Sequence, residues 1–352
     1  MIKYKVFVFA RLKPSQINYK IIPLARSPLV EKVYLLRKTP IEVDNDKVKC
    51  FALPKIFRIR PFYWFFTAIY GAWLIRKKGA DIIVSYNIVP HGFNGYVASL
   101  LTGKKFIYGE ITEDTTRYYN NSFKRFIIRK IFKRADRILV PGSFIGNYWN
   151  KKGFHNTTFL HSTIDPEYFK PDLSYKKQYD FIFIGVFDSL KRPDIIIEAL
   201  SGIKAKNHPD ISLCMIGYGE LQSEIEKQIV KFELMKNITL VTTNNVLDYL
   251  LKSKIFVMAT LTEGIPCAML EAMSCGLIVL VPPVGDISDV VKHHVNGFLH
   301  NNTLEDIVIQ MMSVYNNYET LDFIRKNARE TIINQHAYQV ATMRWTNLLS
   351  SL

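Results

Sequence analysis

The chain has 352 residues, of which 48% are hydrophobic, and this is enough for one large domain or, more naturally, two domains of about 170 residues. Its four cysteines show no paired metal-ligand spacing and no dense disulfide framework, which favours a reduced, cytoplasmic protein. The net charge of +15 is uneven: residues 1–173 hold 30 Lys and Arg against 12 Asp and Glu, a balance of +18, which implies a polyanionic partner such as nucleic acid, anionic lipid or a phosphorylated acceptor.

The first half of the chain alternates apolar, strand-like runs with helical stretches. Strands are predicted at residues 3–10, 30–37, 80–86, 104–110 and 136–142. The first of these runs ends before Arg11 and is too short for a signal peptide, so we expect a first β-strand there. No run in the chain reaches the roughly 18 apolar residues that a membrane-spanning helix requires.

Two stretches of the first half combine apolar residues with cations. Residues 58–78 contain a 14-residue apolar run, Phe62–Ile75, with cations at both ends, and residues 123–137 interleave Phe and Ile with seven cations. Each stretch also fits an ordinary helix, the first buried with solvated ends and the second on the surface. Because both lie in the basic half, we expect them to dock reversibly on an anionic membrane, at about 1 kcal/mol per cation.

A second series of strand-like runs follows a polar stretch at residues 171–178. Strands are predicted at residues 179–186, 211–219, 237–243, 254–260 and 276–283. Strands that alternate with helices indicate parallel sheets, so the two series predict an α/β protein with two doubly wound Rossmann-like domains joined near residues 165–178. A last helical stretch is predicted at about residues 320–350, and it carries Tyr338 and Trp345.

The most informative segment is Thr262–Val291, in which Glu263 and Glu271 stand eight positions apart. Pro266 between them predicts the start of a helix, because the first helical turn tolerates proline. Glu263 would then lie in the loop before the helix, with Glu271 about a turn and a half inside it. The amides of the first helical turn, supported by the helix dipole, would form a phosphate site between the two acids.

A glutamate on a helix is usually solvated, and a pattern of proline, alanine and leucine usually reflects core packing. The continuation favours a binding site, because a glycine helix stop, an apolar strand and a glycine-containing turn follow at residues 275–291. Such a unit places the two acids where the ligands of open α/β sheets collect.

These residues resemble the donor-site signature of the group 1 (family four) glycosyltransferases, retaining enzymes of the two-Rossmann GT-B fold found in bacterial surface-polysaccharide synthesis. The matching positions are Glu263-Gly264-Ile265-Pro266, Glu271-Ala272 with Gly276, Gly285-Asp286 and Asn296-Gly297. The resemblance implies two domains that face each other across a cleft. Residues 1–172 would bind the acceptor, and residues 173–335 would bind the nucleotide-sugar donor. A helix at 336–352 would cross back to the first domain, with Tyr338 and Trp345 at the junction.

The resemblance also implies roles for single residues. Glu263 would hold hydroxyls of the donor sugar, Glu271 the ribose hydroxyls and Lys191 the diphosphate. The further donor contacts that it implies are Gly185, Arg192, Gly217, Gly264, Ile265 and Pro266, with the amides of Cys267, Ala268 and Met269. In the first domain, His91 and Asp114 are the catalytic candidates beside the acceptor, with Glu113 as a substitute for Asp114.

Two departures from the family pattern concern the diphosphate. Val186 stands where relatives carry an arginine, so either Arg192 supplies the second charge or the helix amides hold the diphosphate more loosely. The loop after the first strand lacks the usual glycines, so a side chain such as Lys13 or Ser15 would serve instead.

We therefore expect a retaining glycosyltransferase that moves a sugar from a UDP- or GDP-linked donor to a lipid-linked or polysaccharide acceptor. It would work in capsule, O-antigen or exopolysaccharide synthesis, on the inner face of the bacterial cell membrane. No metal cofactor is expected, because no acid pair of the DxD type lies in a convincing loop. The alternatives are a nucleotide-sugar epimerase, a non-catalytic partner of a transferase, and a nucleic-acid binder, although the aromatic residues lack spaced stacking positions.

Overall fold

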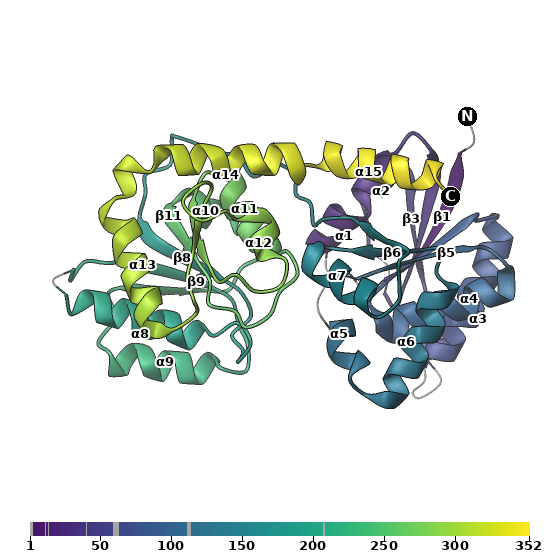
Figure 1. Cartoon of the computed structure of the whole chain (residues 1–352), viewed down its shortest axis with the longest axis horizontal. Helices are drawn as coiled ribbons and strands as arrows, with labels where there is room; N and C mark the ends of the chain where they lie inside the picture. Colours follow the sequence, from purple (N-terminus) through teal and green to yellow (C-terminus); the bar gives the residue numbers. More distant parts are fainter. Residues whose placement is uncertain are drawn as a thin grey trace. The chain divides into compact units, whose positions relative to one another are not determined.

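The computed structural model describes residues 3–10, 12, 14–39, 41–58, 63–110, 114–206 and 208–352. The chain forms two compact units, Met1–Thr163 with Tyr338–Leu352, and Ile164–Ala337 (Figure 1). The chain passes from the first unit to the second after Thr163, which is earlier than the boundary at residue 172 that the sequence suggested. The reason is that the segment after Thr163 is bound to the second unit, where the Arg329 guanidinium donates to the carbonyl oxygen of Phe169 at 3.2 Å.

The first unit is built on a seven-stranded parallel sheet. In spatial order its strands are β3 (Val48–Ala52), β2 (Val30–Arg37), β1 (Tyr4–Phe9), β4 (Ile82–Tyr86), β5 (Lys105–Gly109), β6 (Arg137–Val140) and β7 (Thr157–Phe159). All five predicted strands are present. The sequence pattern missed the two edge strands, β3 and β7, because neither is fully buried and so neither shows a strong apolar run.

Alternation along the strands assigns the helices of this unit to the two faces of the sheet. Phe7 and Phe9 of β1 pack in one core cluster, with side chains from α3 (Tyr63–Lys78), α4 (Phe93–Thr102), α6 (Ser122–Arg134) and α7 (Ser143–Lys151). Val6 and Val8 pack in the other cluster, with α1 (Pro14–Lys20), α2 (Ile22–Arg26) and α15 (Tyr338–Ser350). The shorter helices of the unit are η1 (Lys55–Arg58), η2 (Ile88–Gly92) and α5 (Asp114–Tyr119).

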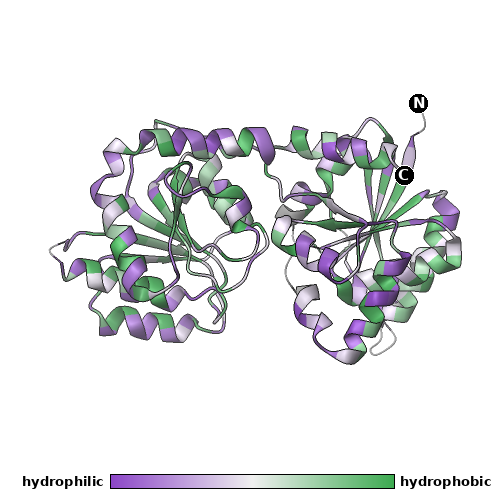
Figure 2. Cartoon of the chain, in the orientation of Figure 1, coloured by the Kyte–Doolittle hydropathy of each residue, from purple (hydrophilic) through white to green (hydrophobic). Residues whose placement is uncertain are grey.

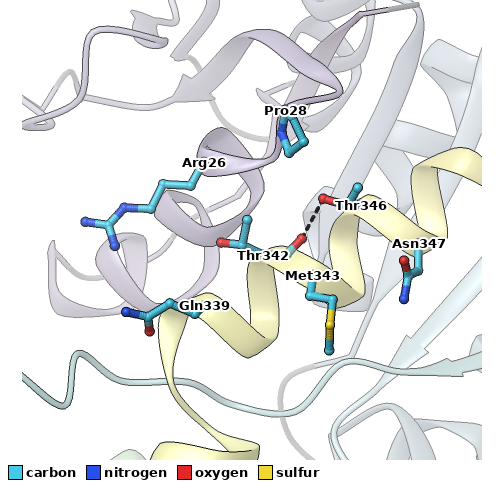
Figure 3. A pocket seen from close by; sticks show the side chains of 7 residues that line it. All are labelled: Arg26, Pro28, Gln339, Thr342, Met343, Thr346 and Asn347. Atoms are coloured by element: carbon cyan, nitrogen blue, oxygen red, sulfur yellow. Dashed lines mark hydrogen bonds between the residues drawn. The ribbon is translucent and has the colours of Figure 1, made fainter. Parts of the chain in front are cut away.

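Helix α15 belongs to the core of the first unit. Trp345 is buried in the cluster that contains α2, and the Thr342 hydroxyl donates to the carbonyl oxygen of Pro23 at 3.1 Å. A hollow of about 380 Å³ lies between the two helices (Figure 3), lined by Arg26, Pro28, Gln339, Thr342, Met343, Thr346 and Asn347. None of the candidate site residues lines it.

The second unit is built on a six-stranded parallel sheet. Its spatial order is β10 (Ile238–Val241), β9 (Leu213–Ile216), β8 (Tyr179–Ile184), β11 (Ser253–Val257), β12 (Ile278–Val281) and β13 (Phe298–Leu299). Its helices are α8 (Pro193–Lys204), α9 (Gln222–Lys231), α10 (Leu247–Leu251), α11 (Cys267–Ser274), α12 (Ile287–Val290), α13 (Leu304–Asn316), η3 (Tyr318–Thr320) and α14 (Asp322–Gln335). The five predicted strands are again present, and the two-residue β13 was missed. Two doubly wound parallel sheets confirm the predicted fold class.

The strand order decides where ligands can bind. In the second unit the chain moves outward from β8 to β9 and β10, and then returns to the other side of β8 with β11. The chain therefore leaves β8 and β11 toward opposite sides of the sheet, and open α/β sheets bind their ligands at such a switch point, where the strand order reverses. In the part of the chain that the structure describes, no helix combines the length and apolar character needed to cross a membrane.

Candidate functional site

The candidate site lies at the carboxyl ends of β8 and β11, on the two loops of the switch point. These loops are bound directly to each other. The Leu261 amide donates to the carbonyl oxygen of Leu190 at 2.8 Å, and the Thr260 hydroxyl donates to the same oxygen at 3.2 Å. The two segments, residues 185–192 and 258–266, thus form one surface although they are distant in sequence.

Lys191 and Glu263 face each other across this surface as an ion pair between Nζ and Oε1. The exposed fractions of their side chains are 25% and 12%, so both charges are largely withdrawn from water. Burial lowers the pKa of Lys191, and the nearby Asp188 carboxylate partly opposes this effect. A ligand can separate this pair if it brings a partner for each charge. A phosphate would bind the Lys191 ammonium, and hydroxyl groups would donate to the Glu263 carboxylate.

Asp188 organises the loop that carries Lys191, and the sequence did not single it out. Its Oδ1 accepts hydrogen bonds from the amides of Leu190 at 3.0 Å and Lys191 at 2.8 Å. This side-chain turn is typical of an aspartate shortly before a helix, which is the signal that could have identified it. The aspartate therefore sets the path by which Lys191 enters the site.

Arg192 occupies the last position before α8, with φ at 51°. Its guanidinium donates to the carbonyl oxygen of Asn302 at 3.1 Å, so in this structure it ties the loop to the segment before α13. Val186, which stands at the family's arginine position, is 42% exposed. Whether Arg192 also contacts a diphosphate stays a prediction.

Helix α11 begins at Cys267, with Pro266 as its N-cap at φ −69° and ψ 126°. The helix thus begins one residue later than predicted, and Pro266 precedes the first turn instead of lying in it. The first turn of an α-helix carries amides that its own earlier carbonyls do not bind, and here this turn directly follows the loop of Glu263. Gly264, Ile265 and Met269 are buried around it.

Glu271 is the fifth residue of α11, about one turn inside the helix. Only 8% of it is exposed, so it does not have the solvated position that most helical glutamates have. Its carboxylate helps to raise the pKa of the Cys275 thiol to about 12, although burial is the larger cause. A buried carboxylate at this position is compatible with the predicted ribose contact.

Gly217 and Gly219 allow the turn after β9 to pack directly on the loop after β8. The amide of Phe187 donates to the carbonyl oxygen of Tyr218 at 3.1 Å, and a Cβ on Gly217 would collide with the carbonyl oxygen of Gly185. A Cβ on Gly219 would likewise collide with the backbone of Phe187. Both glycines are therefore required by close backbone contact, whatever they bind.

We expect Gly217→Ala to destabilise the second unit by about 3 kcal/mol, because the obstacle is backbone and cannot move aside. Gly202→Ala is the matched control: its Cβ would meet Val308 Cγ2 at an ordinary 3.6 Å inside α8, where alanine stabilises a helix by about 0.5–1 kcal/mol. Urea unfolding followed by circular dichroism measures both. Equal stability of the two variants would contradict the packing described for this turn.

A buried histidine that the sequence did not identify supports the Glu263 loop from the C-terminal side. His300 is 2% exposed; the Asn302 amide donates to its Nδ1 at 3.0 Å, and its Nε2 lies 2.8 Å from the carbonyl oxygen of Met258. An amide can only donate, so the ring carries its proton on Nε2 and is neutral. Burial lowers the pKa of His300 accordingly. The Asn302 side chain then donates to the carbonyl oxygen of Thr260 at 2.9 Å.

The candidates of the first unit are less completely described. His91 lies in η2 after β4 and is only 6% exposed. Asp114 is the first residue of α5, and its side chain lies outside the described part of the chain, as do Glu113, Lys13 and the side chain of Ser15. The predicted roles of these residues stay predictions.

Among the residues that the structure describes, no group of three or more His, Cys, Asp or Glu side chains gathers in a way that could hold a metal ion. The expected independence from metal stays a prediction.

A family of known description and several curated relatives match part of the chain. Residues 165–331 match the family of group 1 glycosyl transferases. An Escherichia coli protein named UDP-Gal:alpha-D-GlcNAc-diphosphoundecaprenol alpha-1,3-galactosyltransferase is 31% identical over 186 residues, which cover 49% of this chain and 48% of the relative. An O-antigen biosynthesis glycosyltransferase of the same species is 29% identical over 143 residues, covering 40% and 39%. The chain thus spans about half the length, or less, of these curated relatives.

Solved structures of similar fold match almost the whole chain. The Anabaena protein HepE in complex with UDP has a TM-score of 0.81 at 15% identity, covering 99% of this chain and 100% of that one. Sucrose-phosphate synthase from Thermosynechococcus elongatus has a TM-score of 0.80 at 14% identity, with 99% of each chain covered. At these identities the likeness concerns the fold, and it confirms the GT-B class. Through residues 165–331, just under half of its length, the chain is similar to the group 1 glycosyltransferases.

Proposed function

We propose that the chain is a retaining glycosyltransferase whose second unit binds a nucleoside-diphosphate sugar. The observation that carries this proposal is the partly buried ion pair of Lys191 and Glu263 at the switch point, directly before the first turn of α11. A cation and helix amides suit a diphosphate, and a carboxylate beside them suits sugar hydroxyls. A nucleoside-diphosphate sugar would contact the cation, the helix amides and the carboxylate at the same time.

The roles of the site residues follow from this assignment. The Lys191 ammonium binds the diphosphate, the amides of residues 267–269 bind its distal phosphate, and Glu263 holds hydroxyls of the sugar. The Glu271 carboxylate accepts hydrogen bonds from the ribose hydroxyls. UDP is the preferred nucleotide of the proposal, because the name of the E. coli relative specifies UDP-Gal and the Anabaena structure contains UDP, with GDP as the alternative.

In the proposed reaction, the bond between the anomeric carbon and the phosphate oxygen breaks. The acceptor oxygen bonds to the same carbon on the same face, and its proton passes to the departing nucleoside diphosphate. Charge that develops on the diphosphate is stabilised by fixed dipoles and by the lysine cation, which are already in place. The transfer needs no metal in this scheme, so turnover is unchanged by EDTA.

The acceptor of the proposal is a glycan carried by a lipid, in the synthesis of a bacterial surface polysaccharide such as capsule, O-antigen or exopolysaccharide. The support is the name of the E. coli relative, which specifies a diphosphoundecaprenol acceptor, and that of the O-antigen enzyme. Such an acceptor places the protein on the inner face of the cell membrane.

A thermal-shift screen against UDP, GDP and their common sugars tests the donor assignment. A ligand at 100 times its dissociation constant stabilises the folded state by about 2.7 kcal/mol, so we expect the matching nucleotide to raise the melting temperature by about 5–10 °C. Absence of a shift with every nucleoside diphosphate would favour a non-catalytic partner. NMR of the donor without acceptor provides a second check, because isomerisation of the sugar there would indicate an epimerase.

A further inference from the structure

Helix α3 is apolar on two faces, and only one of them is covered. Ala72, Leu74 and Ile75 are buried in the core of the first unit. On the opposite side, Phe65, Ile69 and Trp73 follow one another at intervals of four residues and are 55%, 42% and 47% exposed. A surface helix normally presents polar residues on its outer face, so this second apolar face requires an explanation.

Two neighbouring helices also carry exposed apolar side chains. Helix α4 packs between α3 and α6 on the same face of the sheet, as seen in Figure 1. Leu100 of α4 is 56% exposed, and Phe123 and Phe126 of α6 are 73% and 61% exposed. We give the name α3–α6 surface to the outer faces of these three helices, with the exposed residues Phe65, Ile69, Trp73, Leu100, Phe123 and Phe126; Figure 2 shows apolar residues on these helices.

The charge of the α3–α6 surface has one sign. The three helices contain no Asp or Glu, whereas α6 alone has six Lys and Arg. Lys77 lies 4.5 Å from the centre of the Trp73 ring, and Lys130 lies 5.5 Å from that of Phe126, so cations stand directly beside the exposed rings. Helix α9 of the second unit differs, because it carries Glu224 and Glu226 as well as two lysines.

We propose that the α3–α6 surface docks on an anionic lipid bilayer. Aromatic and aliphatic side chains would enter the interfacial region, while the adjacent cations bind anionic headgroups. The proposal rests on the proposed function in one respect: a lipid-linked acceptor gives the protein a reason to be at the membrane. The surface itself is defined by the structure alone.

The composition of the surface argues against two other occupants. A second copy of the chain would bring the same cations against themselves in a two-fold contact, with no acids on the three helices to neutralise them. A nucleic acid would bind the cations through its phosphates and stack its bases on the rings, but it would make no favourable contact with the exposed aliphatic side chains of Ile69 and Leu100. An anionic bilayer binds both the cations, through its headgroups, and the apolar side chains, through its interfacial region.

The test measures binding of the full chain to vesicles that contain no acceptor, either neutral phosphatidylcholine or a mixture with phosphatidylglycerol. We expect binding to the anionic vesicles only, and weaker binding as salt increases. Replacing the exposed Lys124, Lys130 and Lys133 by glutamine should weaken binding on the order of a hundredfold, at about fivefold per cation. The matched control replaces Lys227, Lys231 and Lys236, exposed lysines of the second unit, and should bind like the wild type.

A second pair of variants tests the apolar contribution. Serine at Phe65, Phe123 and Phe126 should weaken binding at least tenfold, whereas serine at Val230, Met235 and Phe323, which are 59%, 68% and 52% exposed on the second unit, should not. Failure of the wild type to bind anionic vesicles, or equal binding by the α3–α6 variants, would overturn the proposal. So would a shift with DNA in place of vesicles, or a wild-type dimer in sedimentation that these variants abolish.

The melting-temperature shift with UDP is measured on the same variants. The α3–α6 variants should retain it, since they leave the second unit unchanged. A failure of docking and a failure of the donor assignment are therefore distinguishable.

Discussion

Glu263→Ala is expected to lower the rate of sugar transfer at least a hundredfold while the protein stays folded. The carboxylate is 12% exposed, paired with Lys191 and placed directly before the first turn of α11. In the proposed reaction it holds the sugar in the position where transfer occurs, and loss of one such fixed polar contact typically costs about a hundred- to thousandfold in turnover. Single-turnover assays with UDP-sugar and acceptor measure the effect.

Two comparisons make this result specific to the site. Glu224→Ala removes an exposed acid of α9 and should leave turnover at the wild-type level. Glu263→Gln keeps the shape of the side chain and removes its charge, so it separates hydrogen bonding from electrostatics. Near-normal transfer by Glu263→Ala, with a circular dichroism spectrum like that of the wild type, would rule out the proposed role of this residue.

Lys191→Met should weaken the binding of UDP by roughly ten- to a hundredfold, because a charge-assisted hydrogen bond contributes about 1.5–3 kcal/mol. The charged form of the lysine binds the phosphate. Because burial lowers its pKa, the affinity of the wild type for UDP should decline with rising pH earlier than an ordinary lysine would allow. Isothermal titration with UDP across alkaline pH measures both effects.

Lys191→Arg is the informative companion, since arginine stays charged throughout that pH range and should remove the alkaline decline. Lys227→Met, at an exposed position of α9, should bind UDP as the wild type does. A Lys191→Met variant with unchanged affinity would place the diphosphate elsewhere in the unit.

Much of the fold could be predicted from local patterns. The central strands contain continuous apolar runs such as residues 181–184 and 278–281, which are typical of buried parallel strands. Edge strands β3, β7 and β13 escaped prediction, because a strand that is short or only partly buried lacks this signal. Pro266 marked the start of α11 to within one residue, since proline confines the backbone there.

The candidate site was only partly predictable. Glu263, Glu271 and Lys191 stand in recognisable local patterns, and Asp188 binds amides only two and three positions further on. His300 and Asn302, in contrast, support the Glu263 loop through hydrogen bonds to backbone 42 positions away. Such support depends on which loops meet in space. A buried histidine with two backbone partners has no signature in the sequence around it.

By itself, the sequence determined the alternation of strands and helices, the two sheets and the motif that resembles the group 1 glycosyltransferases, because each depends on residues close together in the chain. Only the tertiary structure decided that Lys191 and Glu263, separated by 72 positions, form an ion pair, and that Arg192 reaches Asn302 across 110 positions. The reversal of strand order between β8 and β11 brings these loops to one edge. Likewise, an apolar helix such as α3 does not reveal which of its faces the core will cover; packing against the sheet decided that Phe65, Ile69 and Trp73 stay exposed.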